Sequence, residues 1–288
     1  MRADLCFQDR GLEGEFVRQT KARRRGVAVQ FGVFRCGVLV LVALKALLQE
    51  KDVPGCLALV LGAASCLVPM LAVQEVWHWA CVVDDILQAV VGCWCHHLIA
   101  PSRAGIWPAA SLFYLLGGSS ILWAHMYCLF SFLPFSVRFV SQAAVCQVLL
   151  AGSRHMCTCS PGLLTAYRTL AALLRWVCGP QLSQLLVLTV RGRGAAAAAA
   201  GTAAGSRDVL RCMSGQAAVL LLPVFVGATF ATYRRELDER RAFLAAAREA
   251  SPQREIRPEV RSAAAASPLD FASFAVPALA AMYIYGIQ

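Results

Sequence analysis

The chain has 288 residues, of which 58% are apolar and 15% charged, and its formal net charge is +10. An ordinary soluble domain has about 45–50% apolar and about 25% charged residues. This composition leaves too few charged side chains to cover a surface in water, so it argues against a water-soluble fold and favours a protein embedded in lipid.

Apolar stretches along the chain predict the membrane-crossing helices, each of which needs about 20 mainly apolar residues. Seven stretches are candidates: 27–48, 53–73, 76–100, 106–133, 136–152, 169–190 and 212–230. An eighth, 271–287, would reach only about 25 Å as a helix and has Pro277 at its middle. We expect that last stretch to be peripheral or membrane-inserted outside the main bundle. The sequence therefore predicts an all-α, multi-pass transmembrane helical bundle.

Two basic clusters predict the orientation of this bundle. Seven basic residues lie in the first 26 positions and eight between Arg234 and Arg261. Because basic residues at membrane edges favour the cytosol, both clusters should be cytosolic, which requires an even number of spans, about six. One candidate then does not cross. It is either 76–100, which holds several polar residues, or 136–152, which has only 17 residues, and both alternatives stay open. We expect an integral protein of the plasma membrane or an endomembrane.

The same patterns divide the chain into five parts. Positions 1–26 form a basic cytosolic segment, and 27–230 form the bundle, including a flexible loop at 191–211 with six consecutive alanines. Positions 231–250 predict a juxtamembrane amphipathic helix. Positions 251–270, which are rich in proline and alanine, predict a disordered linker before the apolar segment 271–288.

The third candidate span carries the most polar side chains. A helix aligns six of its residues in one stripe: His78, Cys81, Asp85, Gln88, Gly92 and Cys95. Polar groups inside a membrane are costly and usually face a cavity or a partner. The stripe therefore predicts either a proton or ion path, with His78, Asp84, Asp85 and Gln88 as candidate residues, or a polar face packed inside the bundle that moves nothing.

Arg35 is the predicted partner of the two adjacent carboxylates. It lies about as far into the first span as Asp84 and Asp85 lie into the third. If both helices run the same way, the charges meet at one depth, and an ion pair offsets much of their desolvation cost. The alternative is that Arg35 reaches back to the nearest membrane surface.

Other chemistry has little support in the sequence. Two clusters contain potential metal ligands, namely Cys93, Cys95, His96 and His97, and His155, Cys157 and Cys159, but neither has the spacing typical of a zinc site. No catalytic or nucleotide-binding motif is found. We expect no enzyme activity, metal or cofactor. The basic clusters lack the interleaved base-reading residues of nucleic-acid binding, so we expect no nucleic-acid partner.

The stretch after the last strong span is the most regular. Phe230, Tyr233, Leu237, Arg240, Leu244 and Ala247 recur at intervals of three and four, the beginning of a heptad seam. This helix is a predicted surface for a homodimer or a protein partner, or else a basic helix at the lipid headgroups.

A small set of residues here resembles a known family of modules. They are Pro223, Tyr233, Glu236, Arg240, Arg241, Phe243 and Leu244. The pattern resembles six-helix membrane modules that precede nucleotide-cyclase or histidine-kinase output domains in microbial and algal signalling proteins. The resemblance implies a sensory or interaction module whose output leaves through 231–250, and we expect no output domain in this chain. The alternative function is a small solute or proton carrier built on the polar stripe.

Overall fold

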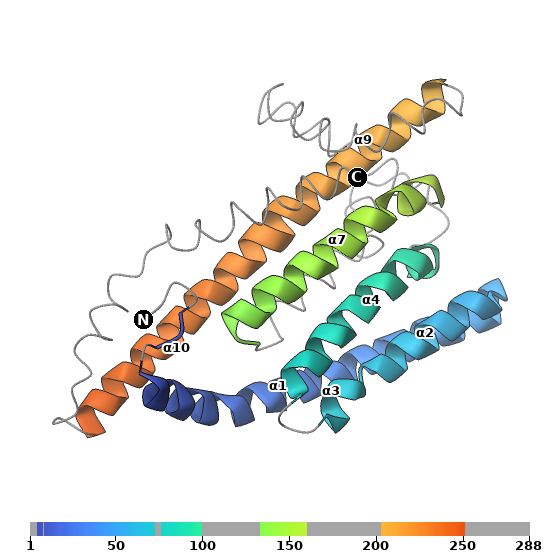
Figure 1. The fold of residues 1–288 in the computed structure, drawn as a ribbon. Coiled ribbons are helices and arrows are strands. Elements are labelled where there is room, and N and C mark those ends of the chain that lie inside the picture. Colours follow the sequence, from blue (N-terminus) through green and yellow to red (C-terminus); the bar gives the residue numbers. More distant parts are fainter. Residues whose placement is uncertain (1–4, 8, 73–75, 100–132, 160–202, 251–288) are drawn as a thin grey trace, which may run out of the picture.

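The computed structural model describes residues 5–7, 9–72, 76–99, 133–159 and 203–250, and all elements in these ranges are helical (Figure 1). The all-α prediction is therefore confirmed. The predicted segments 106–133, 169–190, 251–270 and 271–288 lie wholly or almost wholly outside the described residues. The elements are α1 (Arg10–Lys45) with a π-helical end (Ala46–Glu50), α2 (Val53–Ser65), α3 (Val68–Leu71), α4 (Trp77–Ile99), α7 (Phe135–Cys159), α9 (Ala203–Val219), the π-helical segment η3 (Leu220–Gly227) and α10 (Ala228–Ala250).

Local sequence explains where several helices begin and change pitch. The carboxylate of Asp9 accepts hydrogen bonds from the backbone of the first turn of α1, and Asp52 does the same for α2. Pro223 lies within η3. Proline lacks a backbone donor and its ring displaces the preceding turn, so a π-helical segment keeps α9, η3 and α10 continuous.

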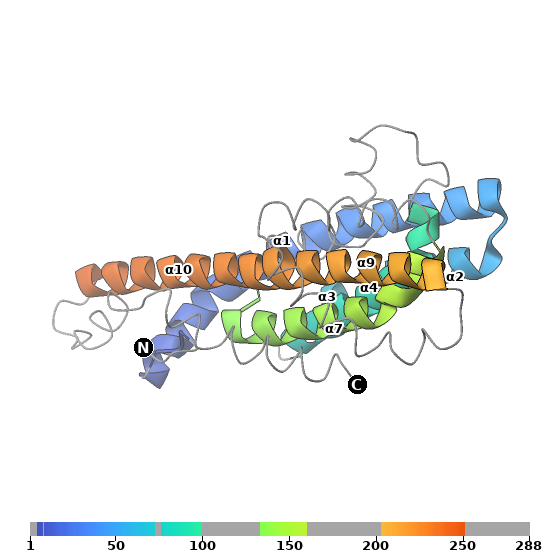
Figure 2. The same ribbon diagram turned by 90° about the horizontal axis from the view of Figure 1, so that it is seen from above.

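The helices lie side by side in a bundle (Figures 1 and 2). α7 lies between α4 and the continuous rod formed by α9, η3 and α10, and α4 packs on its other side against α2. α4 and α7 run in the same direction, because Arg138 reaches Asp85 and Val148 reaches Cys93 further along both. The rod runs the opposite way, since it meets the start of α7 near α10 and the end of α7 near α9.

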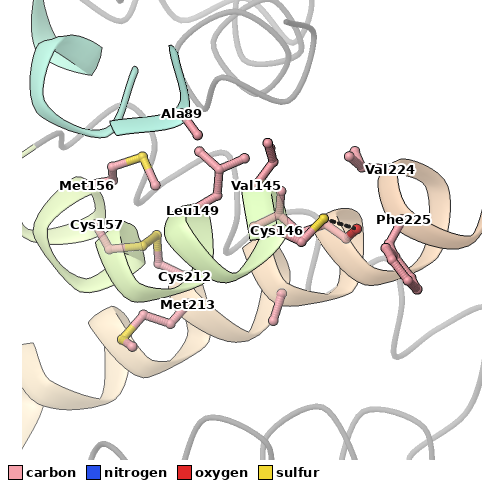
Figure 3. Close-up of a cluster of buried hydrophobic side chains, with 12 residues drawn as sticks. Ala89, Val145, Cys146, Leu149, Met156, Cys157, Cys212, Met213, Val224 and Phe225 are labelled. Carbon is pink, nitrogen blue, oxygen red and sulfur yellow. Dashed lines mark hydrogen bonds between the residues drawn. A yellow bond between two sulfur atoms is a disulfide. The ribbon is translucent and has the colours of Figure 1, made fainter. Parts of the chain in front are cut away.

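The two ends of the bundle differ in chemistry. A disulfide joins Cys157 near the end of α7 to Cys212 in α9 (Figure 3), and we call this the disulfide end. At the other end, called the basic end, α1 starts and α10 finishes, with Arg24 bonded to Glu239. The described chain therefore leaves α7 and enters α9 at the same end, and α1 begins at the end where α10 terminates.

Apolar side chains cover the outside of several helices, while charged ones lie inside. The main core packs α7 against α9 and η3, with Leu149, Cys146 and Phe225 fully buried (Figure 3). By contrast Leu41, Leu57 and many neighbours on α1 and α2 are exposed. In the described residues, four helices are long and apolar enough to cross a membrane: Arg10–Leu48, Val53–Leu71, Phe135–Thr158 and Cys212–Glu249. Such helices belong to an integral membrane protein.

Several predicted boundaries were wrong. The segment predicted as 136–152 is a helix of 25 residues, α7, because polar residues after Gly152 continue the same helix. The basic N-terminal segment and the first apolar stretch share one continuous helix, α1. The predicted flexible loop at 191–211 is helical from Ala203 onward, and the rest of that loop lies outside the described residues.

Close packing between α4 and α7 gives a test of this arrangement. A Cβ added at Gly152 would lie 2.6 Å from Sγ and 3.0 Å from Cβ of Cys93, whereas one at Gly14 of α1 meets nothing within 4 Å. We expect Gly152→Ala to destabilise the protein by about 1–3 kcal/mol through overpacking. Gly14→Ala should instead stabilise it by about 0.4–1 kcal/mol, because alanine restricts the unfolded chain. Thermal unfolding in detergent measures both, and equal effects at the two positions would contradict the α4–α7 contact.

The disulfide predicts how the bundle lies in its membrane. Disulfides persist in oxidising compartments, whereas basic membrane edges favour the cytosol, so the two ends should face opposite sides. In sealed vesicles with the cytosolic face inward, an impermeant maleimide should label a cysteine introduced at Thr158, which is exposed beside the disulfide, above the labelling of the original chain. Labelling of this cysteine only in vesicles of the reverse orientation would place the disulfide end in the cytosol.

Candidate functional site

Two adjacent aspartates of α4 form ion pairs toward opposite neighbours. Asp84 pairs with Arg35 of α1, and Asp85 pairs with Arg138 of α7, whose Nη1 lies 2.8 Å from Oδ2. All four side chains are at least 96% buried. Successive residues of a helix point about 100° apart. One turn of α4 therefore forms ion pairs with α1 on one side and with α7 on the other.

The Asp84 side of α4 is a polar cluster shared with α2. Ser65 Oγ donates to Asp84 Oδ1 at 2.8 Å, and Gln88 Nε2 donates to the carbonyl of Gly62 at 2.6 Å. Arg35 also donates through Nε to Sγ of Cys66 at 3.0 Å. A buried charge is costly unless it is paired and hydrogen-bonded. These contacts therefore hold the Arg35–Asp84 pair in place between α1, α2 and α4.

The Asp85 side is more deeply buried. Ser141 Oγ, one turn after Arg138, donates to the same carboxylate oxygen as Arg138 does. The other oxygen, Oδ1 of Asp85, is buried and has no hydrogen-bond partner among the described residues. An unsatisfied buried acceptor costs about 1–3 kcal/mol. The negative charge of Asp85 therefore depends strongly on its ion pair with Arg138.

A second charged network lies at the basic end, where α10 meets the first part of α1. Arg240 donates to both carboxylate oxygens of Glu13, from Nη1 at 2.6 Å and Nη2 at 2.9 Å, and to Oε1 of Glu236 on its own helix. Arg24 donates to Glu239 at 2.8 Å. We call these five residues the basic-end network. It joins helices more than 200 residues apart in the sequence.

Aromatic rings surround this network. The guanidinium of Arg240 lies 4.3 Å from the ring centre of Phe16 and 4.9 Å from that of Phe7, and Phe243 packs on both rings. Its hydrogen bonds to Glu13 and Glu236 hold the Arg240 guanidinium among these rings. Arg240 therefore clamps α10 to the first part of α1.

Glu236 connects the basic-end network to the membrane-embedded pairs. Its Oε2 accepts a hydrogen bond from the backbone N of Phe135, the first residue of α7, at 2.6 Å. A carboxylate at a helix N-terminus satisfies a free donor and complements the helix dipole. Arg138, which binds Asp85, lies only three residues later on the same turn of α7. A continuous series of polar contacts thus runs from α10 through α7 to α4.

The structure brings together some of the predicted site residues and separates others. The expected ion pair of Arg35 is present with Asp84, and Gln88 lies beside it. Asp85 faces α7 instead, and His78 lies at the start of α4 next to Trp77. The stripe is therefore divided between two interfaces. Arg138, Glu236, Glu13 and Arg24 were not predicted as site residues.

The structure describes members of the two cysteine and histidine clusters, for which the sequence predicted no metal. Cys157 is bonded to Cys212 in the disulfide, and this pairing was not predicted from the sequence. Within the described part of the chain, no group of three potential ligands is placed to hold a metal ion.

The heptad seam of α10 is covered by the same chain. Tyr233 and Leu237 pack with Leu5 and Phe135, and Leu244 packs with Leu12 and Phe16. A second copy would have to displace these residues to use the seam. In a parallel dimer formed along this seam, Arg240 of one copy would also face Arg240 of the other copy.

No family model, curated protein or solved structure matches this chain. The contacts described above therefore carry the functional argument.

Proposed function

We propose that this protein is a membrane-embedded sensory or interaction module whose output leaves through α10. The observation that carries the proposal is the double contact of Glu236, which binds Arg240 of α10 and the first backbone N–H of α7. A displacement of α7 inside the membrane would change the position of this carboxylate. It would thereby change the contact of α10 with α1.

The length of the terminal rod supports an output role. Its three segments of 17, 8 and 23 residues extend over about 70 Å at 1.5 Å per residue. The hydrocarbon core of a bilayer is only about 30 Å thick. Much of α10 therefore extends beyond the membrane, where Arg234 and Asp238 are exposed.

We further propose six crossings with both basic segments cytosolic. On its exposed face α4 carries Trp79, Val83, Leu87, Val90 and Trp94. The two tryptophans are about 22 Å apart along the helix, which suits rings anchored near the two membrane interfaces.

The carrier alternative has weaker support. A carrier needs intramembrane groups that release and take up a proton or solute, but Asp84 and Asp85 are each bonded to an arginine. Reconstituted protein in vesicles tests it directly. A pH-dependent flux that Asp85→Asn abolishes would favour the carrier over the module.

The module is tested by a distance across the basic end. Spin labels carried by unnatural amino acids at Gln19 of α1 and Ala245 of α10, both exposed, leave the cysteines untouched. In bilayers, the original chain should give one narrow distance distribution. Asp85→Asn should broaden or shift it, because Arg138 loses its charged partner and the first turn of α7 loosens.

The control is Asp238→Asn, which removes an exposed carboxylate close to one label and should leave the distribution unchanged. A cooperative thermal unfolding transition in detergent confirms that the variants are folded. An unchanged distribution in folded Asp85→Asn would overturn the proposal.

A further inference from the structure

The first part of α1 has two different faces. One face, with Leu12, Phe16 and Arg24, packs against α10. On another face, Arg10, Arg18 and Lys21 fall within an arc of about 80° at 100° per residue, with Gly14 at its centre. We call Arg10, Arg18 and Lys21 the basic stripe. Arg10 and Arg18 are exposed, and Lys21 is half-buried.

The charges of the basic stripe are not compensated. Throughout the described residues, none of its three members makes an ion pair. Arg18 donates only to the carbonyl of Gly14 on its own helix. Neighbouring arginines behave differently: Arg24 is bonded to Glu239, and Arg25 donates to the carbonyls of Met70 and Ala72. The stripe is thus available for an external anion.

The stripe also lies close to the membrane. It precedes the apolar part of α1, which starts at Val27, without a break in the helix. Figure 2 shows that the first part of α1, in dark blue, runs at a steep angle to the rod of α9 and α10, while the later part of α1 runs along the bundle. This part of the helix therefore crosses the basic end obliquely and does not project straight away from it.

We propose that the basic stripe docks on anionic lipid headgroups of the leaflet at the basic end. Juxtamembrane cations are attracted to anionic headgroups, each strengthening association about five-fold. The apolar face of the same helix is occupied by α10, so it is not free to insert among acyl chains. The contact is therefore electrostatic and weakens as salt shortens the Debye length. It is independent of the proposed sensory function.

The test uses a nitroxide at residue 14, because a Cβ atom added at Gly14 meets no atom within 4 Å and residue 14 is exposed. Full-length protein is reconstituted in phosphatidylcholine bilayers with or without about 30% phosphatidylserine. The measured quantity is the collision rate of the nitroxide with a nickel chelate anchored at the headgroups. We expect phosphatidylserine to raise this rate at least about two-fold at low salt, and about 0.5 M salt to remove the increase.

Two matched variants identify the residues responsible. Arg10→Gln with Arg18→Gln should abolish the effect of phosphatidylserine. Arg241→Gln with Arg248→Gln removes the same charge from α10 and should leave the effect intact. Both variants change residues on the helix surface, and thermal unfolding confirms that they fold. An equal collision rate in both bilayers, which is expected if the stripe faces water or an acidic protein, would overturn the proposal. So would an increase that persists in the first variant.

Discussion

Replacing Arg138 by methionine should destabilise the protein by about 3–5 kcal/mol. In the described part of the chain, the substitution leaves the carboxylate of Asp85 buried with Ser141 as its one remaining donor. Breaking a buried ion pair by removing one partner costs about this much, because the remaining charge is uncompensated. Thermal unfolding of the full chain in neutral detergent measures the loss.

A double substitution separates the contribution of charge to stability from the contribution of packing. Arg138→Met with Asp85→Leu removes both charges, and apolar replacement of a complete buried pair is often close to neutral. The double variant should therefore recover most of the stability lost in Arg138→Met. If the single and double variants are equally unstable, the Arg138 side chain contributes through its shape and not through Asp85.

Arg240→Ala should also cost about 3–5 kcal/mol. Arg240 is 2% exposed and neutralises Glu13 and Glu236 at once, and it packs on Phe16. Its removal leaves Glu236 buried beside α7 without its nearest cation. Arg241→Ala is the matched control on the next residue. Its side chain and that of its partner Asp238 are 37% and 62% exposed, so its loss should cost under about 0.5 kcal/mol.

The difference in stability between Arg240→Ala and Arg241→Ala can be measured as a shift of the unfolding temperature in the same detergent. Similar small shifts for both variants would mean that α10 is not clamped to α1. Arg240→Lys should recover only part of the loss, because a lysine cannot reproduce two-sided hydrogen bonding from a planar guanidinium.

The predicted helical class is confirmed, and of the two alternatives for Arg35 the structure has the ion pair, with Asp84 alone of the two aspartates. Apolar runs of membrane length are long and unambiguous signals. Arg35 and Asp84 each lie a similar distance into spans of the same direction, so depth alone brought them together. Arg138 was missed because its span was taken to be short, so its depth and its alignment with α4 could not be judged.

The basic-end network and the disulfide could not be predicted from local patterns. Glu13 and Arg240 are 227 residues apart, and Cys157 and Cys212 are 55 apart. Nothing in the spacing of either pair specifies contact, which depends on how the helices pack. The regular pattern of α10 was recognised, and it predicted a surface for a protein partner or a basic helix at the lipid headgroups. In the structure, N-terminal residues of the same chain pack on this pattern.

A double-mutant cycle between Asp85 and Glu236 tests most directly whether α7 couples the membrane interior to α10. The variants are Asp85→Asn, Glu236→Gln and their combination, and the measurement is the free energy of unfolding in detergent. Independent sites add within about 0.3–0.5 kcal/mol. Coupling through the first turn of α7 predicts a deviation from additivity of about 1 kcal/mol or more. Additive effects would contradict the account, because the two networks would then stabilise the bundle separately.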